Sequence, residues 1–398
     1  MTKNKWIELI RCALKKYKTP FFLFSYNPVK DQLKSLNRKI GDIGSNWFSL
    51  KTLPLRHLVK WWASQNLGIE VVSEYELRAV LQEGFPPEKI IVNGPGKQSW
   101  DINLWTNNLR VNFDSINEIE SLASTALNRK WRVGIRFHSS IQKDPENAQF
   151  PDQFGIDSSN FRDCKKMLEN SNISLNTIHM HLRSNIPNIN HYNLALNELE
   201  SVINNTNITL KCLDLGGGLP AKGEQQKEKS WHSTLNLNDL DKLINCCKRK
   251  FPTIEEFIFE YGRFLVSGCG VLVLSVIDVK VIEGQRFVIC NGGRTNHALP
   301  SDWQDHDIKI IPDRYGKLIS TAICGPTCMA YDCLSKRKLP NNIKIGDSII
   351  WFNAGAYHLS WETRFSQPLA RVLWHNELNQ IIESRPTEDF NEWWGKWR

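Results

Sequence analysis

One lysine stands where an amine could act as a nucleophile. Lys51 follows the apolar run Phe48-Ser49-Leu50 and precedes a helix-like stretch over residues 55–62. At the mouth of a buried strand, desolvation lowers the pKa of a lysine and lets its neutral amine form a Schiff base with an aldehyde. Because most lysines lie on a solvated surface, the interpretation of Lys51 depends on what the rest of the chain supplies.

Two later segments carry groups that could bind a phosphorylated ligand. Gly216-Gly217-Gly218 follows an apolar strand-like run, and successive glycines let backbone N–H groups form a concave nest for an anion. Glu260 and Arg263 follow the next such run, where a guanidinium can bind phosphate as a fork and a carboxylate can bond a ring nitrogen. A flexible turn and a surface ion pair are the alternative interpretations.

His179 and His181 flank Met180, so both imidazoles face one side of a strand. Such a pair can ligate a metal, but no carboxylate or third histidine stands at a suggestive spacing. We expect one ring to stack on a flat cofactor, with a buried structural histidine as the alternative. The ten cysteines show no paired zinc-site spacing, so we predict no metal and expect buried thiols rather than disulfides.

The composition indicates a globular protein with a small-molecule ligand. The 398 residues are 41% hydrophobic and 23% charged, which suffices for two domains. The net charge is +8, but the densest basic clusters, residues 248–250 and 336–338, are short, so we expect an anionic small molecule and no nucleic acid. No signal-peptide core or membrane span is visible, which predicts a cytoplasmic protein without membrane contact.

Strand-like and helix-like segments alternate along most of the chain. An opening helix reaches about Lys18, one helix over residues 74–81 ends before Gly84, and another over residues 239–247 has Asn238 as a cap. Eight strands separated by helices have the size and rhythm of a closed (β/α)8 barrel, with a doubly wound open sheet as the alternative. These strand-like segments are residues 47–50, 69–72, 90–93, 110–113, 132–137, 178–181, 212–215 and 257–260.

Beyond residue 271 the pattern changes to short β-branched runs separated by turns, which predicts a β-domain. We assign residues 27–272 to the barrel. Residues 1–26, together with residues 273–398, form the predicted β-domain.

In combination, these motifs resemble the fold-type III pyridoxal-phosphate decarboxylases, a group that includes diaminopimelate and ornithine decarboxylases and shares its barrel with alanine racemase. The resemblance runs from about Thr19 to Phe365 and implies pyridoxal 5'-phosphate as the cofactor. The residues that it matches are Lys51 for the Schiff base, His181 for ring stacking, Glu260 for the pyridine nitrogen, and Ser184, Gly216, Gly217, Gly218, Gly262, Arg263 and Tyr357 for the cofactor phosphate.

The segment Cys324-Gly325-Pro326-Thr327-Cys328 is similar to the family loop whose cysteine enters the active site of a partner subunit. The resemblance therefore implies a homodimer with shared active sites, in which Cys328 returns a proton to the substrate's Cα.

The chain also departs from the family pattern. Met329 and Leu299 stand where diaminopimelate enzymes typically carry an acid and an arginine for the distal end of the substrate, and Arg183 and Tyr261 replace a usual glycine and proline. The loss of the two distal contacts, at Met329 and Leu299, argues against lysine-, ornithine- or diaminopimelate-type substrates. The stretch over residues 291–300 is more similar to the branch that acts on larger conjugated amino acids, including siderophore precursors and carrier-bound aminoacyl groups.

The predicted activity is decarboxylation of a small amino-acid substrate. The substrate contacts that we expect are Arg183, Arg294, His297 and Met329. An acid at position 260 keeps the pyridine nitrogen protonated, whereas the resembling racemases place an arginine there, so Glu260 favours decarboxylation. A racemase or epimerase of this fold, and a catalytically silent binding protein, are the alternatives; retention of Lys51, Glu260 and Cys328 argues against the latter.

Overall fold

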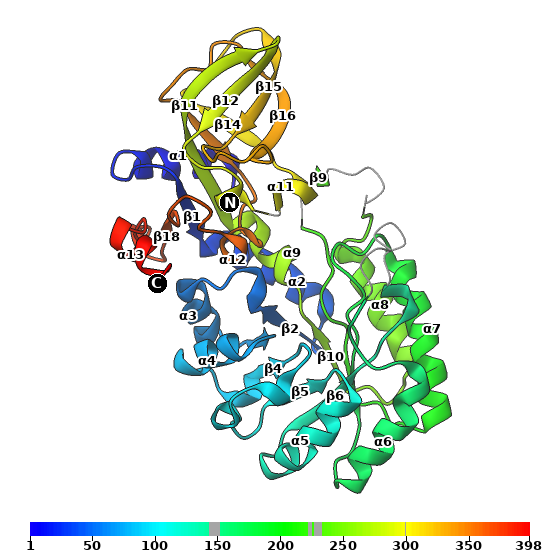
Figure 1. Ribbon diagram of the computed structural model, residues 1–398. Helices are drawn as coiled ribbons and strands as arrows, with labels where there is room; N and C mark the ends of the chain where they lie inside the picture. The colour runs from blue at the N-terminus through cyan, green and yellow to red at the C-terminus, as the bar shows by residue number, and fades with distance from the viewer. Residues whose placement is uncertain (143–151, 222–224, 227–232, 299) are drawn as a thin grey trace.

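The computed structural model describes residues 1–142, 152–221, 225–226, 233–298 and 300–398 (Figure 1). Within these residues, eight parallel strands close into a barrel, with β10 paired to both β2 and β8. The closed (β/α)8 barrel is therefore confirmed, and the open sheet is wrong. The barrel strands are β2 (Gly44–Ser49), β3 (Gly68–Val71), β4 (Ile90–Val92), β5 (Arg110–Phe113), β6 (Arg132–Arg136), β7 (Thr177–His179), β8 (Cys212–Asp214) and β10 (Glu256–Phe259).

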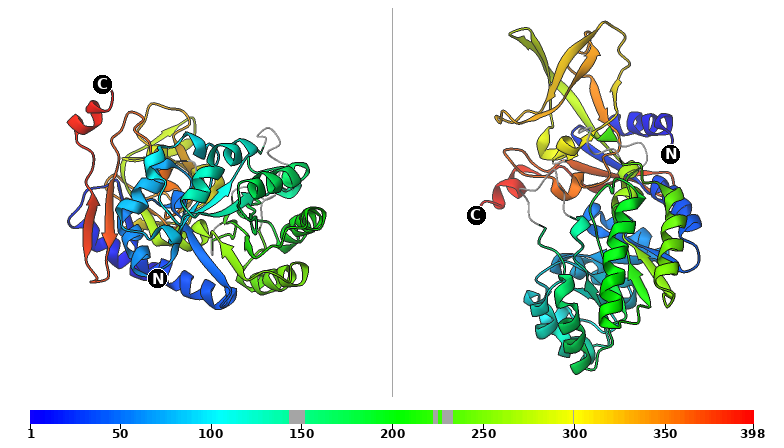
Figure 2. Two further views of the ribbon diagram at one scale, coloured as in Figure 1. Left: turned by 90° about the horizontal axis from the view of Figure 1, so that it is seen from below. Right: turned by 90° about the vertical axis from the view of Figure 1, so that its right-hand side faces the viewer.

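Helices surround the barrel (Figures 1 and 2). The side chain of Ser73 caps α4 by accepting a hydrogen bond from the N–H three residues later. The cap of α8 is Asn236, in a capping box with Asp239, so the prediction of Asn238 is wrong by two residues. The barrel helices are α2 (Tyr26–Ile40), α3 (Arg56–Ser64), α4 (Glu74–Gln82), α5 (Ile116–Asn128), α6 (Phe161–Asn170), α7 (Ile189–Thr206), α8 (Leu237–Lys250) and α9 (Gly262–Val266).

A mixed sheet forms the second body of the molecule, at the top of Figure 1. In this sheet β1 lies between β11, to which it is antiparallel, and β18, to which it is parallel, so the N-terminal strand packs with the C-terminal third of the chain. The strands are β1 (Phe21–Ser25), β11 (Gly270–Ile282), β12 (Gln285–Cys290), β14 (Ile308–Ile311), β15 (Leu318–Cys324), β16 (Cys333–Pro340), β17 (Ser348–Trp351), β18 (Arg371–His375) and β19 (Ile381–Arg385), and a separate pair joins β9 (Gln225–Gln226) to β13 (Gln304–Asp305).

Short helices complete this second body. Helix α1 packs Trp6 and Ile10 against Phe21 and Leu23, which forms a hydrophobic core separate from that of the barrel. The opening helix ends at Leu14, four residues before the predicted end. The exact division at residues 26/27 and 272/273 stays a prediction. These helices are α1 (Lys3–Leu14), α10 (Arg294–His297), α11 (Pro300–Trp303), α12 (His358–Trp361) and α13 (Phe390–Gly395).

All ten cysteines are free thiols, as predicted. The expectation that they are buried is wrong for Cys12 and Cys328, which are exposed on the outer side of α1 and on a loop. No described helix is both long and apolar enough to cross a lipid bilayer.

Candidate active site

A polar pocket lies at the carboxyl ends of the barrel strands. It brings together groups that are far apart in the sequence, because parallel strands deliver their carboxyl ends to one rim. The strands that carry the site end one or two residues earlier in the structure than the sequence predicts. The functional side chains therefore stand on the loops that follow the strands. The pocket is lined by Ser49, Lys51, Thr52, His181, Ser184, Asn185, Gly217, Gly218, Leu219, Glu260, Gly262, Arg263 and Tyr357.

Lys51 stands on a short 3-10 turn (Leu50–Thr52) directly after β2 and reaches the pocket. Its Nζ lies 3.2 Å from both carboxylate oxygens of Glu70, and 39% of its side chain is accessible. Burial opposes the charge of the amine, but the fields of Glu70 and Glu260 outweigh burial and raise the pKa of Lys51. The expectation of a lowered pKa for Lys51 is therefore wrong.

Glu70 and Glu260 are linked by a single amide. The Nδ2 of Asn93 donates to Glu260 Oε1 at 2.6 Å and to Glu70 Oε1 at 3.2 Å. Asn112 Nδ2 donates in turn to Asn93 Oδ1 at 2.9 Å, which fixes the orientation of that amide. These polar side chains are buried, and their hydrogen bonds hold both carboxylates in fixed positions.

Glu260 faces His179 and Asp214 as well as the pocket. Burial alone would raise the pKa of Glu260, but His179, Lys51 and His181 outweigh burial and lower it. His179 Nε2 lies 3.5 Å from Glu260 Oε2. Burial and the neighbouring Glu260 raise the pKa of Asp214, so within this pair the negative charge is favoured on Glu260.

Opposite Lys51, the glycine loop leaves space for a phosphate. Gly218 has φ +105°, and a Cβ on Gly217 would lie 2.9 Å from the carbonyl oxygen of Glu260 and 3.2 Å from the ring of His181. The guanidinium of Arg263 lies 4.8 Å from the ring centre of Tyr357, and both side chains line the same end of the pocket. Backbone amides, a guanidinium and a phenol therefore fit a phosphate group, with an amine in reach for an aldehyde.

His181 is fixed by the glycine loop. Gly217 N–H donates to His181 Nδ1 at 3.0 Å, which fixes the plane of the imidazole. Burial, with the neighbouring cations Arg136 and Lys51, lowers the pKa of His181 to about 3. The ring is therefore neutral at physiological pH, which suits stacking on a flat ligand better than proton donation.

Comparison with known proteins gives this pocket its chemistry. Residues 27–267 match the family described as "Pyridoxal-dependent decarboxylase, pyridoxal binding domain". The chain belongs to this family. Its cofactor is pyridoxal 5'-phosphate, and the protein is a pyridoxal-phosphate-dependent amino-acid decarboxylase.

Individual relatives of this decarboxylase align over most of its length. Diaminopimelate decarboxylase of Zymomonas mobilis is 25% identical, with 93% of this chain and 90% of the relative aligned. The L-glutamyl-[BtrI acyl-carrier protein] decarboxylase of Niallia circulans is 26% identical over 88% and 87%. The structure of diaminopimelate decarboxylase from Helicobacter pylori complexed with L-lysine has a TM-score of 0.83 and 22% identity, and covers 98% of both chains, which shows a common fold.

Several predicted site residues of the decarboxylase lie outside the pocket lining. Arg294 is paired with Asp302 at 2.7 Å and stacks on Tyr331, so its guanidinium is already engaged. Arg183 lies close to His191. The pKa of His191 is lowered by burial and by the positive charge of Arg183. His297 is 1% exposed and lies in the second body, outside the pocket lining, so its contact with substrate stays a prediction.

The loop after β15 carries two further predicted residues. Cys328 is exposed and Met329 is half-buried, and neither lines the pocket of its own chain. Gly216 is also absent from the lining but has φ +62° and donates its N–H to Asp214. Leu299 lies outside the described residues.

Sequence inspection missed the residues that position the decarboxylase pocket from within the barrel. Glu70, Asn93, Asn112 and Asp214 are all buried and hydrogen-bonded to one another or to pocket residues. A signal was present, because each is a polar residue at or near the carboxyl end of an apolar strand.

Proposed function

We propose that this decarboxylase acts on an amino acid whose distal end carries no free ammonium, such as a conjugated or carrier-bound aminoacyl group. The observation that supports this substrate class is the state of the loop after Cys328. The first acid that follows this cysteine, Asp332, is buried and accepts hydrogen bonds from the N–H groups of Arg294 at 2.8 Å and Thr327 at 3.1 Å. Asp332 is therefore buried and engaged in organising the loop, and is not placed to bind a distal amine.

The same reasoning applies to a distal carboxylate. Arg294 is paired with Asp302 and stacks on Tyr331, so its guanidinium is already engaged and is not placed to bind a distal carboxylate. The relative from Niallia circulans, whose name specifies a glutamyl group on an acyl-carrier protein, agrees with a distal end that is conjugated. A substrate without distal charge is bound mainly through its α-amino-acid end and through apolar contact.

Lys51 would hold the cofactor covalently through its amine, and Arg263, Tyr357 and the amides of Gly217 and Gly218 would hold the phosphate. When bound, the cofactor supplies the electron sink for the pair released as the α-carboxylate leaves. Glu260, ionised and held by Asn93, would keep a proton on the ring nitrogen. The neutral ring of His181 would lie against the face of the cofactor and exclude water from it.

The protonation of Cα needs an acid from elsewhere. We infer that Cys328 supplies this proton to the pocket of a second copy, because it is exposed and lies outside the lining of its own pocket. Its loop is held by backbone contacts to Asp332, which present the thiol outward. The functional unit is then a two-fold homodimer in which neither subunit has a complete site alone.

A CO2-release screen tests the substrate class. Free glutamate, lysine, ornithine and diaminopimelate would be compared with acyl-, citryl- and carrier-conjugated forms of the same amino acids. We expect kcat/KM for a conjugate to exceed that of the matched free amino acid at least about tenfold, which corresponds to about 1.4 kcal/mol, the scale of one net hydrogen bond. Preference for free diaminopimelate would contradict the proposal.

The covalent role of Lys51 is tested by spectroscopy. Wild-type protein loaded with cofactor should show visible absorption of an enzyme-bound imine, and Lys51→Ala should lose that absorption together with CO2 release. Lys60→Ala, which removes an exposed lysine of α3, is the matched control. An unchanged spectrum in Lys51→Ala would show that another amine holds the cofactor.

A further inference from the structure

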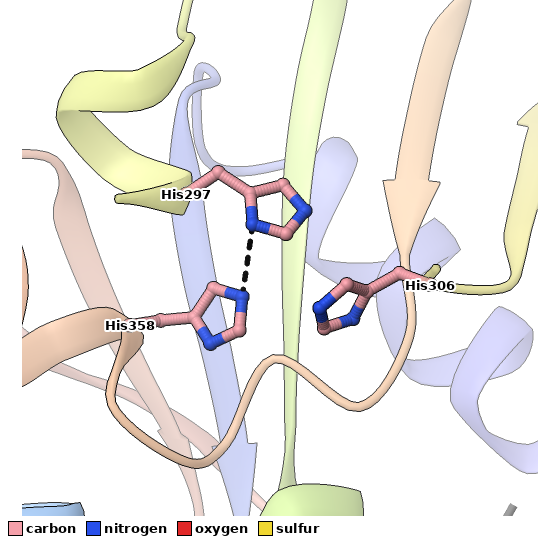
Figure 3. Close-up of side chains that lie close together, drawn as sticks. All are labelled: His297, His306 and His358. Atoms are coloured by element: carbon pink, nitrogen blue, oxygen red, sulfur yellow. Dashed lines mark hydrogen bonds between the residues drawn. The ribbon is translucent and has the colours of Figure 1, made fainter. Parts of the chain in front are cut away.

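Three histidines from separate segments meet inside the second body of the molecule. His297 ends α10, His306 follows β13, and His358 begins α12. All three are at most 4% exposed, and their ring centres lie 4.6–5.1 Å from one another. Figure 3 shows the rings turned toward a common centre. Because these histidines are far apart in the sequence, their spacing gives no indication of a metal site.

Backbone carbonyls fix the tautomers of two of these rings. His358 Nδ1 lies 3.0 Å from the carbonyl oxygen of Ala356, and His306 Nδ1 lies 2.7 Å from that of Phe352. A carbonyl oxygen can only accept, so both Nδ1 atoms carry the proton and both Nε2 atoms carry a lone pair. A histidine whose Nδ1–H is held by a carbonyl is the arrangement that orients metal-binding histidines in proteins.

The spacing of the nitrogen atoms suits a tetrahedral ion. His297 Nδ1 lies 3.1 Å from His358 Nε2. Two imidazoles on a tetrahedral zinc ion have nitrogen atoms about 3.3 Å apart, given Zn–N distances of about 2.0–2.1 Å. One ligand atom from each of the three histidines lies within 4.8 Å of the others, so the third ring needs to move by at most about 1.5 Å to complete the set.

We propose that His297, His306 and His358 bind one divalent transition-metal ion of the Zn²⁺ class, with water as the fourth ligand. Imidazole suits Zn²⁺, whereas Mg²⁺ and Ca²⁺ require oxygen ligands, which this cluster of rings does not contribute. Ion binding requires His297 to move its proton from Nδ1 to Nε2, a tautomer change without a change in charge.

Neighbouring charges limit the affinity of the site. The cation Arg263 acts on His358, and its positive charge opposes the binding of a metal ion there. The guanidinium of Arg337 donates to the carbonyl of His306 and is paired with Asp305, so its charge is partly compensated. The ligand set itself is uncharged, so we expect tight but exchangeable binding rather than a permanently closed structural zinc site.

The ion would connect the second body to the cofactor pocket. His358 directly follows Tyr357, whose N–H donates to the carbonyl of Thr52 beside Lys51 at 2.8 Å. Tyr357 has φ +67°, an unfavourable backbone conformation for a non-glycine residue that its surroundings must maintain. A metal ion on His358 would hold this strained segment in place, which assigns the ion a positioning role rather than a chemical one.

Metal content tests the proposal independently of decarboxylase activity. Full-length protein loaded with pyridoxal phosphate would be treated with a chelator, dialysed, incubated with Zn²⁺, dialysed again and assayed by elemental analysis. We expect about one Zn²⁺ per chain in the wild type and at least a tenfold lower content in His306→Gln. His375→Gln is the matched control, because His375 is equally buried but bonds Ser25 and Asn379, outside the cluster.

A second measurement avoids reliance on variants that fold poorly. Wild-type protein loaded with Co²⁺ should show the intense visible bands of tetrahedral cobalt, and X-ray absorption at the zinc edge should fit three imidazole nitrogens and one oxygen. A wild type without stoichiometric zinc, a Co²⁺ spectrum like that of the hydrated ion, or equal zinc in His306→Gln and His375→Gln would overturn the proposal.

Discussion

Asn93→Ala tests whether the barrel interior, and not only the pocket surface, sets the rate of decarboxylation. The amide of Asn93 donates one hydrogen bond to each of two buried carboxylates, Glu260 at 2.6 Å and Glu70 at 3.2 Å. A hydrogen bond to a charged group contributes about 1.5–3 kcal/mol. Loss of the bond to Glu260 alone therefore predicts a fall in kcat of about 10- to 150-fold, at about 1.4 kcal/mol per factor of ten.

The cofactor should remain bound in this variant, because Lys51 and the glycine loop are untouched. The assay is CO2 release with the best substrate of the screen, with cofactor absorption recorded on the same sample. Asn291→Ala is the matched control: Asn291 Nδ2 donates to the carbonyl of Thr19 at 2.8 Å and its Oδ1 accepts from Ser275 N–H at 2.9 Å, and both partners are neutral. We expect the control to stay within about twofold of wild type. A kcat of Asn93→Ala within threefold of wild type would refute the positioning role.

Three further predictions follow from the same geometry. Glu260→Gln should lower kcat by about 10²–10³-fold and leave cofactor absorption in place, since a fixed charge beside the reacting system is removed; stopped-flow CO2 measurements check this. Burial raises the pKa of Glu76 from its ordinary 4.5 to about 7, so the folded protein holds a proton that the unfolded chain releases, and stability falls as pH rises through this window. Glu76→Gln should therefore stabilise the protein by about 3 kcal/mol at pH 8 and by little at pH 4, measured by thermal and urea unfolding; equal effects at both pH values would contradict it. Mixed Lys51→Ala and Cys328→Ser subunits should regain about a quarter of wild-type activity, because half of the dimers then hold one complete site; no recovery after verified subunit exchange would argue against shared sites.

Much of the pocket could be predicted from local patterns. Lys51, the glycine loop and Glu260 each follow an apolar strand-like run, and the order of those runs along the chain is the order of the barrel strands. Strand identity depends on side-chain alternation and on turn residues nearby in the sequence, so it can be read without tertiary contacts. The ends of the strands could not be predicted in this way. Each strand ends where a polar side chain turns toward the pocket, and the position of that turn depends on residues that are neighbours only in space.

The electrostatics of the pocket depended on neighbours that the sequence does not identify. The sequence places an amine after an apolar run, which suggests a lowered pKa for Lys51, but Glu70 arrives from the adjacent strand and reverses the direction. Arg294 and Asp302 are close in the sequence, yet only the fold shows that they pair with each other.

The sequence by itself determined which strands and loops this decarboxylase has, and hence which residues stand at one rim of its barrel. The tertiary structure alone decided which charges are compensated, which amide joins the two carboxylates, and that three distant histidines meet. The physical reason is the distance along the chain over which the deciding interactions act. Strand and helix patterns arise from interactions over a few residues, whereas charge, protonation and ligand geometry depend on groups that only the folded chain brings within a few ångströms.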